Sequence, residues 1–224
     1  MFANPQEADA VVDGPFGKMM HGKLQAQGIV GLAYWELGFR DITNSKRPIT
    51  KVDDIAGLKL RVIPNAINVD WVKALGANPT PLAFPEVYAA LDQKAIDGQE
   101  NPPTVISANK FYEVQKYIAL SNHQYNPQSL IFSKKVWDAL GAASQKILSD
   151  AAVEAGKYQR QVSRDAAGTA LDTLRKNGME VTELSPAELA KFREAMKPVI
   201  AKHSEIVGAD TVSALQAELA KLRK

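Results

Sequence analysis

The chain has 224 residues, of which 46% are hydrophobic and 23% charged, so it can bury a sizeable core and is not a disordered, highly charged tail. Lys and Arg number 27 against 25 Asp and Glu, a near balance that gives no indication of nucleic-acid binding. The absence of cysteine excludes thiol catalysis, disulfides and thiolate metal sites, and no apolar run approaches the ~20 residues of a membrane span.

Up to Pro127 the pattern predicts short strands and helices. Segment 57–63 alternates apolar and basic residues, which is typical of a strand. Pro85 followed by an acidic residue marks the start of a helix over 86–94. The other elements expected here are a helix at 70–75 ended by Gly76, an extended segment at 79–84, a short strand or turn at 95–98, and strands at 116–121 and 129–132.

A proline-free stretch rich in Ala, Lys, Arg, Gln and Leu predicts one long helix over about 142–176, stopped by Gly178. Such a helix would be ~50 Å long, wider than a small domain. Its apolar positions keep no heptad, so we expect it to bridge two lobes, with Gly156 and Gly168 as possible bend points. A strand at 179–184, a helix from Ser185 to about Lys197 and a helix at 210–222 complete an α/β pattern with a largely parallel sheet.

Several kinds of reactive site have no signature in the sequence. The three histidines, His21, His123 and His203, lack metal-ligand spacing. No nucleotide-binding glycine motif and no nucleophile elbow occurs. We therefore expect no metal, no cofactor and no covalent nucleophile.

Arg61 stands near the carboxyl end of the 57–63 strand, where open α/β sheets bind ligands. A guanidinium matches a carboxylate through two parallel hydrogen bonds, so Arg61 is a candidate carboxylate-binding residue. The alternative is a structural ion pair with a nearby Asp or Glu. From the residue pattern alone, the ion pair is favoured by about two to one.

A polar segment and a set of aromatic residues are weaker signals. Residues 97–102 place Asp97, Glu100 and two amides after a short strand, which suits ligand hydrogen bonds, an acid/base pair or simply a solvated turn. The aromatic residues could line a ligand cleft, although plain core packing is the commoner role. They are Trp35, Phe39, Phe84 and Tyr125.

Taken in order, these segments resemble the solute-binding protein of a tripartite ATP-independent periplasmic (TRAP) transporter, DctP type. The resemblance covers nearly the whole chain from Phe16-Gly17 onward. It is carried by the blocks WELGFR (35–40), RPI (47–49), DIAGLKLRV (54–62), GANPTP (76–81), FPEVYAAL (84–91), DGQENP (97–102), FYE (111–113) and HQY (123–125).

The resemblance implies a non-enzymatic protein that binds a small carboxylate in the periplasm and delivers it to the TRAP membrane subunits. It assigns Arg61 as the carboxylate clamp, Asn101 as the amide that hydrogen-bonds the ligand and Phe84 as the aromatic wall. Arg40 matches a second arginine near the ligand. Trp35, His123 and Tyr125 match further positions around it.

The implied fold is a two-lobed periplasmic binding protein in which the 142–176 helix joins the lobes. Lobe one would hold 1–38 and 127–166, and lobe two 39–126 and 167–224. Residues 1–5 show no signal peptide. The family carries a further stretch before the position of Met1, so we expect lobe one to be incomplete here, ligand binding to be weak and self-association to occur.

Two other functions stay open. One is the ligand-sensing domain of a receptor or regulator built on the same fold. The other is an enzyme acting on a carboxylic acid with Asp97 or Glu100 as an acid/base pair.

Overall fold

The computed structural model describes residues 2–223 and divides into two compact units. Unit 1 comprises Met1–Gly38, Tyr125–Asp165 and Asp210–Lys224, and unit 2 comprises Phe39–Gln124 and Ala166–Ala209. The last stretch, Asp210–Lys224, groups with unit 1, although the sequence predicts a second lobe that includes 167–224. The reason is local, because Lys23 Nζ donates to Thr211 Oγ1 at 2.6 Å and the Arg223 guanidinium pairs with Glu7 at 2.7 Å.

Unit 2 is built on a mixed sheet. Its strand order is β3-β2-β4-β1-β5-β6, where β1 and β5 also extend into unit 1. The β2–β3, β2–β4 and β5–β6 pairs are parallel, and β1 runs antiparallel to β4 with Asp41 opposite Asn101. The strands are β1 (Ile29–Asn44), β2 (Lys59–Val62), β3 (Asn78–Pro81), β4 (Gly98–Asn101), β5 (Tyr117–Ser133) and β6 (Glu180–Glu183).

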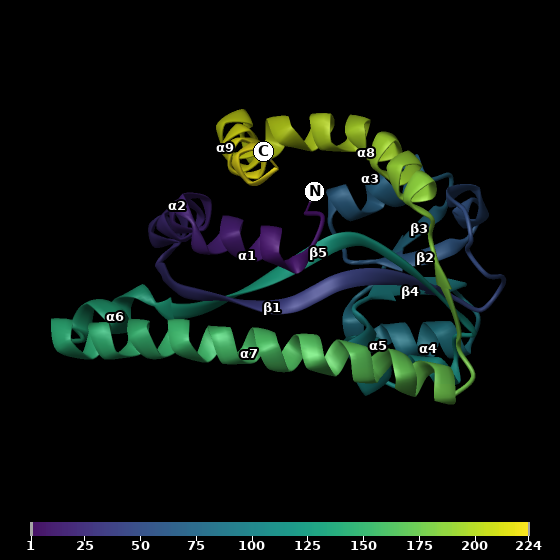
Figure 1. Cartoon of the computed structure of the whole chain (residues 1–224), viewed down its shortest axis with the longest axis horizontal. Helices are drawn as coiled ribbons and strands as arrows, with labels where there is room; N and C mark the ends of the chain where they lie inside the picture. The colour runs from purple at the N-terminus through teal and green to yellow at the C-terminus, as the bar shows by residue number, and fades with distance from the viewer. Residues whose placement is uncertain (1, 224) are drawn as a thin grey trace. The chain divides into compact units, whose positions relative to one another are not determined.

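Helices cover both faces of this sheet (Figure 1). On one face, α3 (Ala66–Ala74) and α8 (Pro186–Val207) bury Trp71 and Phe192 against the apolar side chains of β2. On the other face, α4 (Val87–Asp92) and α5 (Pro103–Ala108) pack with Phe111 and the end of α7 (Ala142–Lys176) around Leu174. Unit 2 therefore has two apolar cores, one on each side of the sheet.

Unit 1 contains α1 (Pro5–Asp13), α2 (Pro15–Leu24), α6 (Lys134–Ala139) and α9 (Ala209–Leu222), with the first part of α7. The long helix α7 spans the range predicted from the sequence and passes from unit 1 into unit 2 after Asp165. Gly156 lets α7 approach β1 closely, since a Cβ there would lie 3.1 Å from the Trp35 ring. Within residues 2–223, none of the helices is both long and apolar enough to cross a membrane.

Three elements are clearly longer than predicted. α3 begins at Ala66 instead of residue 70, because the Asn65 side chain caps it by accepting the N–H of Asn68. β5 is one strand where two were expected. It continues through the polar residues between them, where Asn122 adopts a left-handed conformation with φ of 43° and its N–H donates to the Asp41 carboxylate. α8 runs past Pro198 to Val207 instead of ending near Lys197. Burial of Val199 and His203 beyond the proline favours continuation and offsets the hydrogen bond that proline cannot donate.

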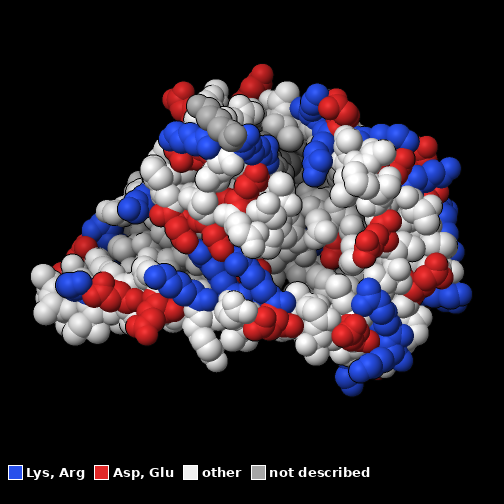
Figure 2. Space-filling view, viewed as in Figure 1, with Lys and Arg blue, Asp and Glu red and all other residues white. Residues whose placement is uncertain are grey.

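Charged side chains of both signs are intermingled on the face of the molecule drawn in Figure 2. Figure 2 shows basic and acidic residues side by side over the face in view, without a large area of one sign.

Candidate functional site

Arg61 is a buried cation that forms no ion pair with any carboxylate of residues 2–223. Its side chain leaves β2 on the face opposite to Leu60 and Val62, and only 3% of the residue is exposed. Nε donates to the carbonyl oxygen of Leu82 at 2.8 Å, and the guanidinium carbon lies 6.0 Å from the centre of the Phe84 ring. Within residues 2–223, no carboxylate oxygen lies within 4.0 Å of its nitrogens. The structural ion pair that the residue pattern favoured is therefore absent from the described chain.

Burial lowers the pKa of Arg61, while the charge of nearby Glu100 opposes that effect. A buried charge is costly unless it is paired and hydrogen-bonded. The side chain of Arg61 is thus placed where an added anion would be stabilised.

Phe84 lies beside Arg61 and is partly open to solvent. It begins the short helical turn Phe84–Glu86 and is 41% exposed. Its ring centre is 6.1 Å from that of Phe111, which is buried and holds it in place. An exposed ring next to an unpaired guanidinium gives the site one flat apolar wall and one cationic group.

Arg40, Glu100 and His123 form a buried polar cluster in unit 2. Arg40 Nε donates to Glu100 Oε2, and Nη2 donates to Glu100 Oε1 at 2.8 Å and to the Glu100 carbonyl at 2.6 Å. His123 Nε2 lies 3.4 Å from Glu100 Oε2, and its ring packs against Trp71. Burial alone would raise the pKa of Glu100, but His123 and Arg40 outweigh burial and hold it below its usual value.

The two acidic residues of the 97–102 segment have different partners. Asp97 accepts from the backbone N–H of Lys59 at 2.9 Å and pairs with Lys46, whereas Glu100 pairs with Arg40. Asn101 follows Glu100 on β4 and is buried, and its Nδ2 donates to Gln99 Oε1 at 2.6 Å. The segment is therefore a buried strand rather than a solvated turn.

Asp41 is a buried carboxyl group that sequence reasoning missed. It lies opposite Asn101 and accepts the backbone N–H of Asn122 at 3.0 Å. Burial raises its pKa to about 7. No motif marks this residue, and only the pairing of β1 with β4 and β5 brings it next to Asn101 and Asn122.

We expect Asp41→Asn to stabilise the protein at about pH 8 and to have little effect near pH 4. The folded pKa of Asp41 is raised, so stability falls as the pH rises from its ordinary value of 3.8 to about 7. At ~1.4 kcal/mol per pH unit, the ionised form costs up to about 4 kcal/mol above this range. Asparagine keeps an oxygen for the Asn122 N–H. Urea unfolding at both pH values measures the difference, and an equal gain at both would contradict this explanation.

Trp35 and Tyr125 lie in unit 1. Trp35 Nε1 donates to the carbonyl of Ala152 at 3.5 Å. Tyr125 donates its hydroxyl proton to Glu36 Oε2 at 3.1 Å. A shallow pocket in this unit is lined by Trp35, Gln128, Ser129 and Leu130.

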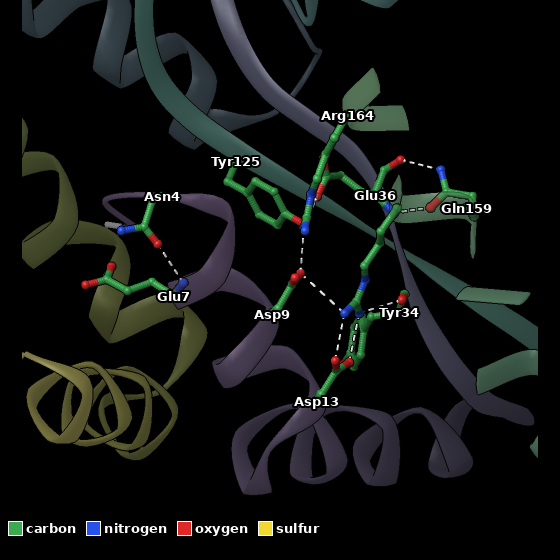
Figure 3. Close-up of polar contacts among 10 residues, drawn as sticks. Asn4, Glu7, Asp9, Asp13, Tyr34, Glu36, Tyr125, Gln159 and Arg164 are labelled. Atoms are coloured by element: carbon green, nitrogen blue, oxygen red, sulfur yellow. Dashed lines mark hydrogen bonds and ion pairs between the residues drawn. The ribbon is translucent and has the colours of Figure 1, made fainter. Parts of the chain in front are cut away.

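The Glu36 carboxylate belongs to a network that joins α1, β1 and α7 (Figure 3). Arg164 contacts Glu36 at 2.6 Å and Asp9 at 2.8 Å, and Arg160 contacts Asp13 at 2.6 Å. Tyr125 thus contacts an ion-pair network of unit 1. Arg61, Phe84, Arg40, Asn101 and His123 all lie in unit 2.

The mixed sheet and the long helix shared by two units define the two-lobed α/β fold of periplasmic binding proteins. The family model for bacterial extracellular solute-binding protein, family 7 (DctP), matches residues 1–205. The chain belongs to this family, which confirms the resemblance found in the sequence.

Solved structures and curated relatives agree with this assignment. A TRAP periplasmic solute-binding protein from Ochrobactrum anthropi is 51% identical with a TM-score of 0.92, and the match covers 99% of this chain and 69% of that chain. The sugar acid binding protein DctPAm from Advenella mimigardefordensis, in complex with galactonate, is 43% identical with a TM-score of 0.93, covering 98% and 71%. The C4-dicarboxylate-binding periplasmic protein DctP of Rhodobacter capsulatus is 36% identical over 99% of this chain and 66% of its own length. The chain spans 55% to 66% of the length of three curated relatives.

Proposed function

We propose that this chain binds a small organic acid through its carboxylate and belongs to the periplasmic solute-binding component of a TRAP transporter. The observation that carries the proposal is Arg61, a buried guanidinium for which no carboxylate of residues 2–223 lies within ion-pair distance. The relatives support the ligand class, since galactonate and C4-dicarboxylates share a carboxylate.

Each proposed contact has a physical basis in unit 2. Arg61 would hold the ligand carboxylate through two parallel hydrogen bonds, and Asn101 would add an amide contact. Phe84 would cover the apolar side of the ligand, and the ion pair with Glu100 would hold Arg40 in place. His123 would hold the Glu100 carboxylate in place through their 3.4 Å contact. The proposed partners are the membrane subunits that receive the acid.

A thermal-shift screen of the 224-residue chain tests the ligand class. Each acid is paired with its neutral alcohol, for example galactonate with galactitol, at concentrations that reveal weak binding. We expect one or more acids to raise the melting temperature and their neutral counterparts to leave it unchanged. Stabilisation by neutral sugars or amines alone would refute the proposal.

We also propose that the chain self-associates through strand edges of unit 1. β4 pairs with β1 only at residues 41–44, and β6 pairs with β5 only at 117–120. Within residues 2–223, no further strand borders the unit 1 parts of β1 and β5. Because Gln159 and Arg160 of α7 bond the β1 backbone at Glu36 and Tyr34, we place the pairing at the β5 edge from Pro127 onward, where such an edge favours pairing with another chain. The proposal predicts that light scattering detects a dimer that increases with concentration, and a monodisperse monomer would contradict it.

A further inference from the structure

We propose that Gln99, Thr43 and Gln115 are positioning residues that fix the orientation of the Asn101 carboxamide for the ligand. This inference rests on the proposed function, because it concerns how a residue of that same site is held. None of the three residues is assigned to the ligand. They act through a line of hydrogen bonds that ends at Asn101.

The four side chains form a continuous chain of contacts inside unit 2. Asn101 Nδ2 donates to Gln99 Oε1 at 2.6 Å, and Gln99 Nε2 donates to Thr43 Oγ1 at 2.9 Å. Thr43 Oγ1 in turn donates to Gln115 Oε1 at 2.8 Å, a much shorter contact than its 3.5 Å approach to the Gln99 carbonyl. All four residues are buried, so water does not compete for these bonds.

The contacts of Gln115 determine which group donates and which accepts in each hydrogen bond of this line. Gln115 Nε2 donates to two backbone carbonyls, of Val114 at 2.9 Å and of Asp97 at 3.3 Å. Carbonyl oxygens only accept, so the amide of Gln115 cannot turn over, and its Oε1 must face Thr43. The single hydroxyl proton of Thr43 is used on Gln115, and its oxygen therefore accepts from Gln99.

The orientation of Gln115 therefore determines the orientation of the Gln99 carboxamide, which in turn determines that of Asn101. The Oε1 atom of Gln99 must face Asn101, so Asn101 must donate to it from Nδ2. A flipped Asn101 would place two oxygens against each other at 2.6 Å. One amide hydrogen of Asn101 is thus committed to Gln99, and its second amide hydrogen and Oδ1 keep a single orientation.

The same orientation suits an acid held by Arg61. The parallel pairing of Leu60 with Gly98 puts Arg61 on the sheet face that also carries residues 99 and 101. The second N–H of Asn101 can donate to the carboxylate that Arg61 clamps. A freely flipping amide would offer this donor only part of the time and would bind the acid less tightly.

A double-mutant cycle on the full chain tests the inference, with galactonate as the probe. Thr43→Val removes the hydroxyl at nearly constant volume, and Thr43→Ser retains it. We expect Thr43→Val to weaken galactonate binding about tenfold in the parent and less than about twofold in the Asn101→Ala background. Thr43→Ser should bind within about twofold of the parent. An equal loss in both backgrounds, or no loss in the parent, overturns the inference.

A ligand-free measurement keeps this test independent of the proposed function. In nitrogen-15 NMR spectra of the apo chain, we expect Thr43→Val to shift and broaden the side-chain amide signals of Asn101, and Thr43→Ser to preserve them. If Thr43→Val fails to fold, Gln115→Met removes the amide at the other end of the same line of hydrogen bonds. Unchanged Asn101 signals overturn the inference even where no acid binds, whereas shifted signals without acid binding refute the proposed function alone.

Discussion

Replacing Arg61 by alanine is expected to weaken acid binding at least about 30-fold and to leave the melting temperature of the apo chain nearly unchanged. Loss of one partner of a buried, hydrogen-bonded charge pair costs ~2–5 kcal/mol, which corresponds to roughly 30- to 4,000-fold in affinity. Within residues 2–223, the apo chain loses the hydrogen bond to the Leu82 carbonyl and the contact with the Phe84 ring, and the removal of a buried charge that has no carboxylate partner there offsets these losses. Calorimetric titration beside apo melting curves measures both quantities.

Arg61→Lys is the matched control for this prediction. Lysine keeps the positive charge but cannot form two parallel hydrogen bonds, so its affinity should fall between those of the parent and the alanine variant. The affinities are compared with the parent chain under the same conditions, so the prediction holds whether the parent binds tightly or weakly. Binding of Arg61→Ala within about threefold of the parent would rule out the clamp.

Removing Arg40 is expected to destabilise the protein by about 3–5 kcal/mol, because Glu100 would then be a buried carboxylate without its arginine. Arg40→Met preserves much of the side-chain length and removes the charge. Since the folded pKa of Glu100 is lowered, the contribution of the pair is present at neutral pH and is lost as the pH falls through that lowered value. Urea unfolding near pH 7 measures the loss.

The double variant Arg40→Met/Glu100→Met provides the control. Replacing both members of a buried ion pair by apolar residues is often neutral or stabilising. Most of the stability lost in the single variant should therefore return. A single variant that loses less than about 1 kcal/mol would mean that Arg40 does not compensate Glu100.

Elements with strong local signals could be predicted from the sequence. The alternation in 57–63 identified β2, and the helix-forming composition of 142–176 identified α7 with its bounds. β5 was predicted as two pieces because the polar residues around Asn122 carry no local strand signal. Their place in the strand depends on tertiary contacts such as the bond from the Asn122 N–H to the Asp41 carboxylate.

The candidate site likewise contains residues that the sequence could predict and residues that it could not. Arg61 could be singled out because an arginine inside a strand is unusual. That no carboxylate of residues 2–223 pairs with it depends on distances that only the fold sets. Thr43 and Gln115 lie far from the 97–102 segment in sequence, and the sheet brings them to Gln99. Residues that act through others have no local pattern and could not be predicted.

The central claim is that the Arg61 guanidinium binds a ligand carboxylate. The most direct measurement follows the Nε–Hε signal of Arg61 by NMR while an acid, such as galactonate, is added to the chain. We predict a saturable shift of this signal with the acid and none with the matched alcohol galactitol. Saturable binding of the acid, seen in other signals while the Arg61 signal stays unmoved, would contradict the claim.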